Sequence, residues 1–196
     1  MLHQTPLLKK IIKEPAVVIN DKHLKLPGSK QGKGHYLPIL QITVDQLDAM
    51  LSHHCKVLVL RLDLRLHKGS PDNRVMSSFI HRYRNSLQNR GFKRIGYVWC
   101  REQDTSHAQH YHCVFLLDGN KARHPHNIIR VIEHLWEDWE LGSAYTPKKC
   151  YGLLKRDDKS AYQKLFNRLS YLAKVATKSN RAAATNDYSA SRLKPK

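Results

Sequence analysis

The clearest periodic pattern in the chain runs through KVLVLRLDLRL, residues 56–66, where leucine alternates strictly with other residues from Leu58 to Leu66. Leucines take every second position, and the positions between them hold Val57, Val59, Arg61, Asp63 and Arg65. Successive side chains of a strand point to opposite faces of a sheet. The pattern therefore predicts a strand with one apolar face and one largely charged face.

Two further strands are predicted by KRIGYVWCRE and HYHCVFLLD, which the polar residues 103–109 join into a hairpin. Apolar residues at helical spacing predict helices within residues 38–54, 70–91, 124–142 and 158–179. The segment CYGLLKR, before the last of these helices, suggests a short strand pair. This order predicts an α+β fold with a mainly antiparallel sheet and helices packed on it. A ferredoxin-like topology fits best.

The length of 196 residues fits one domain with ragged ends. Residues 1–36 are basic and short of large apolar clusters, which predicts an N-terminal arm that packs loosely or wraps. Residues 37–178 hold all the strong helix and strand patterns and form the expected domain. Residues 179–196 are polar and basic, and we expect a mobile tail.

The charge of the chain indicates a polyanionic partner. Lys and Arg number 34 against 16 acidic residues, a formal net charge of +18. Nucleic acid is the first candidate, and a merely basic protein is the alternative. No stretch approaches the roughly 18 uninterrupted apolar residues of a membrane span, and no signal peptide is evident, so we expect a cytoplasmic protein without a membrane partner.

The cysteines do not suggest a disulfide framework or a cysteine zinc site, because they are far apart and no C-x-x-C occurs. They are Cys55, Cys100, Cys113 and Cys150. Cys113 follows His112 directly, so in a strand it faces away from the histidines, and we expect it to pack in the core.

Two histidines, His110 and His112, stand two residues apart at the start of the second hairpin strand and would share one face of the sheet. Either alone would more often be a hydrogen-bonded core residue. If residues 103–109 form the loop, however, Glu102 lies across from His110, and cross-strand neighbours are ~5 Å apart at Cβ. Two nitrogens and an oxygen suit a divalent ion, Mg²⁺ or Mn²⁺ in use, although Zn²⁺ could bind.

A tyrosine on the last predicted helix is the candidate nucleophile. Tyr171 lies off the apolar stripe, and its neighbours at helical spacing include Lys164, Arg168, Lys174 and Lys178. Such a basic stripe suits a phosphate, and Lys174 would stabilise a phenolate. The alternative is a tyrosine that covers the helix edge, and Tyr162 is the lesser candidate.

The charged face of the first strand has two readings. Arg61, Asp63 and Arg65 either border the site and contact a DNA backbone or form a solvated, salt-bridged face.

Together these residues resemble the HUH endonucleases, named for His-hydrophobic-His, here His110-Tyr111-His112. The likeness extends to Tyr-x-x-Lys, here Tyr171 to Lys174, and to Glu102, which looks like the third ligand of Rep-type members. The RLDL strand, the RE…HYH hairpin and the closing YSASR look like the filamentous-phage (inovirus) gene-product-2-like replication proteins, also called the YagK/YfjJ C-terminal domain family. The resemblance covers roughly residues 37–192.

The resemblance implies an HUH fold of RRM-like type and a metal-dependent enzyme that nicks and rejoins single-stranded DNA to start rolling-circle replication of a phage, prophage or plasmid. Tyr171 would form a 5′-phosphotyrosyl link with help from Lys174, and no small-molecule cofactor is needed. The metal ligands would be Glu102, His110 and His112. The expected DNA contacts are Arg61, Arg65, Lys164, Arg168 and Lys178.

Further partners of such an initiator would be single-stranded origin DNA and the host helicase and polymerase. Two alternatives stay open. One is a non-catalytic DNA-binding regulator on the same scaffold, and the other is a Y1-type transposase with the same chemistry. Chain length, net charge and the tail do not separate them.

Overall fold

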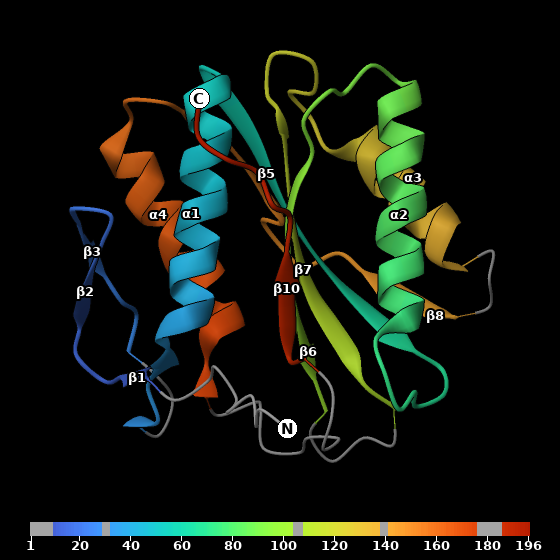
Figure 1. Cartoon of the computed structure of the whole chain (residues 1–196), viewed down its shortest axis with the longest axis horizontal. Coiled ribbons are helices and arrows are strands. Elements are labelled where there is room, and N and C mark those ends of the chain that lie inside the picture. Colours follow the sequence, from blue (N-terminus) through green and yellow to red (C-terminus); the bar gives the residue numbers. More distant parts are fainter. Residues whose placement is uncertain (1–9, 29–31, 104–107, 138–140, 176–185) are drawn as a thin grey trace, which may run out of the picture.

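A computed structural model of the chain describes residues 10–28, 32–103, 108–137, 141–175 and 186–196. Within these ranges the protein has an α+β fold, with four α-helices packed on a six-stranded antiparallel sheet (Figure 1). This confirms the fold class predicted from the sequence.

The sheet consists of strands from the middle and the end of the chain. They are β5 (Lys56–Leu66), β6 (Gly96–Glu102), β7 (His110–Asp118), β8 (Gly142–Tyr145), β9 (Tyr151–Lys155) and β10 (Tyr188–Ala190). The helices are α1 (Leu37–His53), α2 (Arg74–Asn89), α3 (His126–Glu137) and α4 (Lys159–Leu169), and a 3₁₀ turn η2 (Ser170–Ala173) follows α4. Two small ribbons lie outside the sheet: β1 (Ile11–Ile12) with β4 (His35–Tyr36), and β2 (Ala16–Ile19) with β3 (Lys22–Lys25).

The strand order is β10-β6-β7-β5-β8, and β9 also pairs with β5. Helix α2 connects β5 to β6, and α3 connects β7 to β8. The inner order β6-β7-β5-β8 is therefore that of the split β-α-β arrangement of ferredoxin-like folds. This topology places β5 and β7, which carry most of the polar residues of interest, side by side at the centre of the sheet.

Each face of the sheet has its own hydrophobic core, as the alternation along β5 predicts. The leucines from Leu58 to Leu66 pack with α2 and α3, whereas Val57 and Val59 pack with α1 and α4. Figure 1 shows the sheet nearly edge-on between these two helix layers. Cys113 is fully buried in the α2–α3 core, which confirms its predicted packing role.

The described part of residues 1–36 packs more closely than the sequence indicated. The β2–β3 hairpin lies beside α4 and α1 in Figure 1, and its residues Val17, Ile19 and Leu24 are buried in the α1–α4 core. Tyr36 joins the same core. The N-terminal segment therefore covers the core as well as contributing charge.

Part of the predicted tail forms the edge of the sheet. Residues 188–190 are strand β10, which pairs with β6, and Ser191 is buried and donates a hydrogen bond to Gln46 on α1. The prediction of a mobile tail is therefore wrong for residues 186–196, because backbone pairing with β6 fixes this segment although it is short and polar. Residues 179–185 lie outside the described residues.

We expect removal of residues 186–196 to destabilise the fold. Loss of the β10 ladder and of the Gln46–Ser191 bond should cost about 2–3 kcal/mol, at roughly 1 kcal/mol per hydrogen bond lost. For a chain of this size that lowers the Tm by about 5–10 °C in thermal denaturation. Arg192→Ala is the matched control, because it removes an exposed cation and leaves the strand in place. An unchanged Tm in the truncated chain would contradict a structural role for β10.

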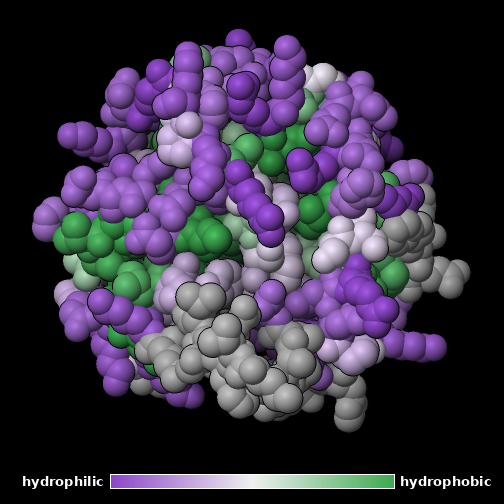
Figure 2. All heavy atoms as spheres, viewed as in Figure 1, coloured by the Kyte–Doolittle hydropathy of each residue, from purple (hydrophilic) through white to green (hydrophobic). Residues whose placement is uncertain are grey.

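None of the helices in the described ranges has the length and hydrophobicity needed to cross a membrane. Figure 2, drawn from the same side as Figure 1, shows a largely hydrophilic surface, with a hydrophobic area at the left over the β2–β3 hairpin. Hydrophilic side chains thus dominate this face of the molecule.

Candidate metal centre and the adjoining tyrosine

The hairpin of β6 and β7 brings Glu102 and the two histidines together. In the antiparallel register Glu102 is opposite His110, and Cys100 is opposite His112. Because side chains alternate along each strand, Glu102, His110 and His112 all point to the α1–α4 face. The register predicted from the loop length is confirmed.

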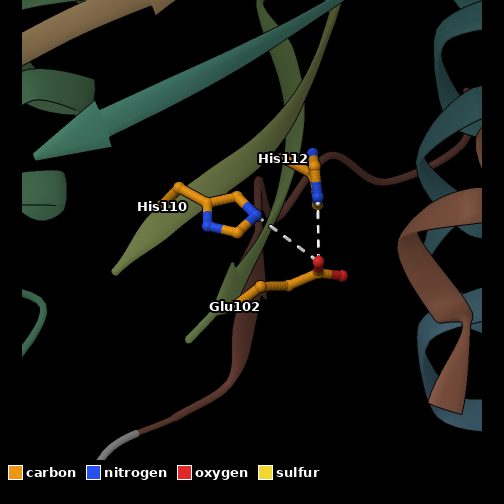
Figure 3. Close-up of side chains that lie close together, drawn as sticks. All are labelled: Glu102, His110 and His112. Carbon is orange, nitrogen blue, oxygen red and sulfur yellow. Dashed lines mark hydrogen bonds and ion pairs between the residues drawn. The ribbon is translucent and has the colours of Figure 1, made fainter. Parts of the chain in front are cut away.

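The three side chains converge at one point (Figure 3). Nε2 of His112 lies 2.9 Å from Oε2 of Glu102, and Nε2 of His110 lies 3.5 Å from the same oxygen. One nitrogen or oxygen ligand atom from each residue lies within 4.8 Å of the others. The Glu102 and His112 side chains are almost fully buried, whereas that of His110 is 25% exposed. The group therefore has an open side.

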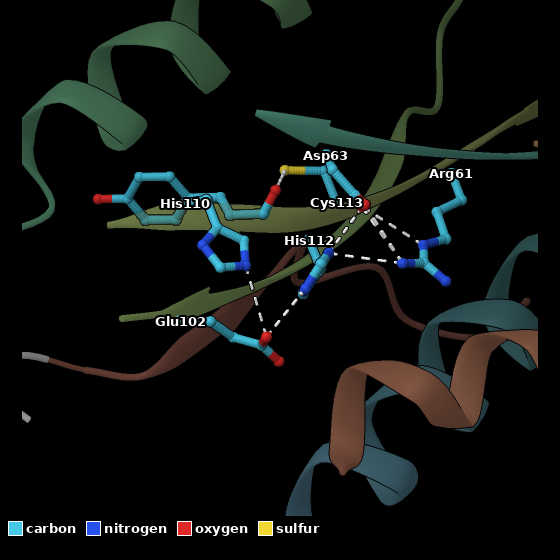
Figure 4. Close-up of polar contacts among 7 residues, drawn as sticks. Arg61, Asp63, Glu102, His110, His112 and Cys113 are labelled. Atoms are coloured by element: carbon cyan, nitrogen blue, oxygen red, sulfur yellow. Dashed lines mark hydrogen bonds and ion pairs between the residues drawn. The ribbon is translucent and has the colours of Figure 1, made fainter. Parts of the chain in front are cut away.

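His112 is held from both ends by carboxylates. Its Nδ1–H donates a hydrogen bond of 2.7 Å to Oδ1 of Asp63, which lies opposite it on β5, and Nε2 contacts Glu102 (Figure 4). Burial disfavours the charged imidazole, but the bonds to Asp63 and Glu102 outweigh burial and raise the pKa of His112. Burial likewise opposes ionisation of Asp63, yet the hydrogen bonds from His112 and Arg61 lower its pKa. The protonated imidazole and the ionised Asp63 carboxylate therefore stabilise each other.

This arrangement fits a divalent metal ion. A carboxylate that accepts a hydrogen bond from one ring nitrogen of a histidine fixes the imidazole tautomer and leaves the other ring nitrogen to bind the metal. Here Asp63 accepts from Nδ1–H, so Nε2 of His112, once it gives up its proton, could join Nε2 of His110 and a Glu102 oxygen as ligands. The open side at His110 would leave further positions of a bound ion accessible from outside the protein.

Asp63 therefore orients His112, one of the candidate metal ligands. Sequence reasoning placed it on the correct face but assigned it to a DNA-contacting or salt-bridged surface. Its role depends on the pairing of β5 with β7, which residues 61–65 alone do not reveal. The signal that the sequence offered was the position of Asp63 itself, an acid between Arg61 and Arg65 on the face of the predicted strand that was expected to border the site.

We expect Asp63→Asn to weaken Mn²⁺ binding about 10-fold to 100-fold, the usual cost of losing an orienting carboxylate. The amide keeps the shape of the side chain and loses the charge that stabilises the imidazole. Isothermal titration with Mn²⁺ measures the change, and Asp157→Asn, at an exposed carboxylate, is the control. Equal Mn²⁺ affinity in Asp63→Asn and the unmodified protein would refute this role.

Tyr171 lies beside the metal group, but its local structure differs from the prediction. The last helix ends at Leu169, and Tyr171 belongs to the 3₁₀ turn η2. Leu172 and Ala173 are fully buried, and the backbone of Lys174 is extended and bridges to His35. Tertiary packing thus overrides a sequence with good helix formers.

Three side chains surround the half-buried Tyr171 ring. The His112 ring meets it edge to face, with centroids 5.2 Å apart. The guanidinium carbon of Arg61 lies 4.3 Å from the ring centroid, and Nζ of Lys174 lies 4.6 Å from it. The structure therefore brings the predicted nucleophile, its predicted lysine and a predicted metal ligand into one site.

The N-terminal segment helps to position this tyrosine. The amide of Val175 donates to the carbonyl oxygen of Gly34, next to the His35–Lys174 bridge. Gly34 has a φ of +80°, and a Cβ there would meet the Ile12 carbonyl oxygen. Only glycine suits such a position, so the backbone that anchors the end of η2 depends on it.

The predicted DNA contacts fall in different places. Arg61 and Arg65 share the site face of β5, Arg61 against Tyr171 and Arg65 exposed opposite His110. Lys164 is exposed on α4, and Arg168 donates to the Tyr151 carbonyl oxygen at 3.3 Å. Lys178 lies outside the described residues. The prediction of one continuous basic stripe along the last helix is therefore wrong, because α4 ends before Tyr171.

Comparison with known proteins places this site within a family. The family model described as YagK/YfjJ C-terminal domain matches residues 20–186, which include the β5–β7 ligands and the tyrosine turn. Searches of curated proteins and of solved structures gave no match.

Proposed function

The chain belongs to the YagK/YfjJ C-terminal domain family, and from the site in this domain we propose that it is a metal-dependent enzyme that nicks and rejoins single-stranded DNA. The observation that carries the proposal is the contact between Tyr171 and His112, a residue of the Glu102–His110–His112 group. A tyrosine next to a group that could hold a metal supplies the two parts that attack on a phosphodiester needs, a nucleophile and a Lewis acid.

The reaction exchanges one phosphodiester for another. The oxygen of Tyr171 attacks the phosphorus, a P–O bond to the tyrosine forms, and the bond to the 3′ oxygen breaks. Tyr171 loses a proton and the departing 3′ oxygen gains one, so the products are a 5′-phosphotyrosyl link and a 3′-hydroxyl. Attack by a 3′-hydroxyl reverses the step and reseals the strand, which needs no nucleotide cofactor.

The residues around the tyrosine have separate roles in this scheme. A divalent ion on Glu102, His110 and His112, Mg²⁺ or Mn²⁺, would polarise a non-bridging oxygen of the phosphate. The cations of Lys174 and Arg61 both lie against the Tyr171 ring, where Lys174 would stabilise the phenolate and Arg61 would contact the phosphate. The net charge of +18 favours a polyanionic strand along this face.

The proposed biological role is initiation of rolling-circle replication of a phage, prophage or plasmid. A 3′-hydroxyl released by the nick primes synthesis, and the covalent link keeps the 5′ end for rejoining. The host helicase and polymerase would then extend the strand. This role rests on the resemblance in the sequence and on the chemistry above.

The test is formation of a covalent adduct. Incubation of the protein with end-labelled single-stranded origin DNA of the element that carries it and Mn²⁺ should give a band on a denaturing gel that moves with the protein. A chelator should remove the band. If the protein binds the strand without ever forming the adduct, the enzyme is excluded and a non-catalytic DNA-binding regulator remains.

A further inference from the structure

A cavity of about 240 Å³ adjoins Tyr171 on the same face of the sheet as the metal group. Val59 on β5 contributes to its wall two residues before Arg61, and Leu165 and Leu169 on α4 contribute from the helix layer. Tyr171 is itself a lining residue. The cavity and the metal group therefore share the tyrosine as a common boundary.

The lining of this cavity has two chemical parts. Valine, leucine and proline side chains make an apolar interior, and the cations Arg61, Lys148, Arg168 and Lys174 stand around it. No carboxylate lines it in the part of the chain that the structure describes. A ligand with a flat apolar ring and a negative charge matches both parts.

We propose that this cavity binds the base of a nucleotide adjoining the scissile phosphate of single-stranded DNA. The inference rests on the proposed function and assigns the substrate a second contact point, beyond the reacting phosphate. A base unstacked from its neighbours enters the cavity, while the cations contact the flanking phosphates. Aromatic and Arg side chains commonly hold single-stranded bases in this manner.

The size of the cavity favours a single base. Sites for drug-sized ligands measure roughly 300–1,000 Å³, and this cavity, at about 240 Å³, is smaller. Asn167 supplies a neutral polar group, and its amide oxygen accepts a hydrogen bond from Gln163 that fixes its orientation. An oriented amide can hydrogen-bond the edge of a base, so Asn167 is the residue that would give base preference.

A second cavity, of about 590 Å³, is larger but has the wrong charge for DNA. It lies against the β2–β3 hairpin and α4, and four aspartates contribute to its lining: Asp21, Asp48, Asp157 and Asp158. Carboxylates repel a phosphodiester, and the three lysine and arginine side chains of this cavity are fewer than its aspartates, whereas the cavity beside Tyr171 has four such cations. The smaller cavity is therefore the nucleotide site.

Cys150 offers a direct probe of this cavity. It is a half-buried lining residue, whereas Cys100 and Cys113 are fully buried and Cys55 is exposed. In a Cys55→Ser chain, iodoacetamide therefore reports on Cys150. Burial raises the pKa of the Cys150 thiol, so the reaction is run at mildly alkaline pH without added metal, which prevents cleavage.

Two probes of equal length and charge separate base binding from phosphate binding. One is a single-stranded oligonucleotide, and the other is an abasic deoxyribose-phosphate strand. At about ten times the Kd of each strand, the oligonucleotide should slow alkylation of Cys150 about tenfold, because roughly a tenth of the cavities stay open. The abasic strand, equally bound as judged by fluorescence anisotropy, should leave the rate unchanged.

Cys150→Phe provides a second measurement that does not depend on labelling. The larger side chain fills the cavity, so affinity for the oligonucleotide should fall toward that for the abasic strand, which should not change. Equal protection by both strands, or no protection by either, would overturn the base site and leave the nicking activity intact. If neither strand binds at all, the proposed function fails with it.

Discussion

Tyr171→Phe is expected to abolish the covalent DNA adduct completely while leaving the affinity for uncut single-stranded DNA within a few-fold. The change removes one oxygen and keeps the ring that packs against His112 and Arg61. The metal ligands and the surrounding cations are unaltered, so binding persists without chemistry. A denaturing gel measures the adduct, and fluorescence anisotropy measures the affinity.

Tyr162→Phe is the matched control, because this second tyrosine lies on α4 but is unsuited to attack. Burial, reinforced by the Asp48 carboxylate to which its hydroxyl donates at 2.8 Å, raises the pKa of Tyr162 far above its usual value. The variant should lose about 1 kcal/mol of stability with that hydrogen bond and still form the adduct. An adduct that survives in Tyr171→Phe would assign the attack to another residue.

His110→Ala and His112→Ala should both abolish Mn²⁺-dependent nicking, but only His112→Ala should also destabilise the fold. His110 lies at the open side of the group, so its loss removes a ligand without disturbing the core. The His112 ring is buried and hydrogen-bonds the carboxylates of Asp63 and Glu102. Removing one partner of such a buried network costs about 3–5 kcal/mol.

Thermal denaturation and the nicking assay together test this difference. An unchanged Tm in His110→Ala with no cleavage would show that the loss is one of metal binding and not of folding. If both variants cut at the normal rate in chelator-treated buffer resupplied with Mn²⁺, the assignment of the metal ligands would be refuted.

The parts of the fold that depend on local pattern were predictable. The alternation in β5 sets which residues face each helix layer, and the seven-residue loop sets Glu102 opposite His110. These follow from the two-residue period of a strand. The metal-ligand group was therefore accessible from the sequence alone.

The parts that depend on distant contacts were not predictable. The end of α4 at Leu169 is set by buried neighbours and by the bridge from Lys174 to His35, far away in the sequence. The Asp63–His112 bond requires β5 to lie beside β7 in one particular register. Strand β10 is short and polar, and only its pairing with β6 makes it a strand. No local periodicity encodes such contacts.

The order of the strands has a consequence for synthesis on the ribosome. Segments near residue 60 and residue 115 pair at the sheet centre, so the hairpin that carries Glu102, His110 and His112 can assemble early. The turn that carries Tyr171 and the closing strand β10 emerge much later. Contacts between distant segments form slowly. On the proposed function, a nascent chain would therefore hold the Glu102–His110–His112 group before it has a nucleophile, and an unfinished polypeptide would form no covalent link to DNA.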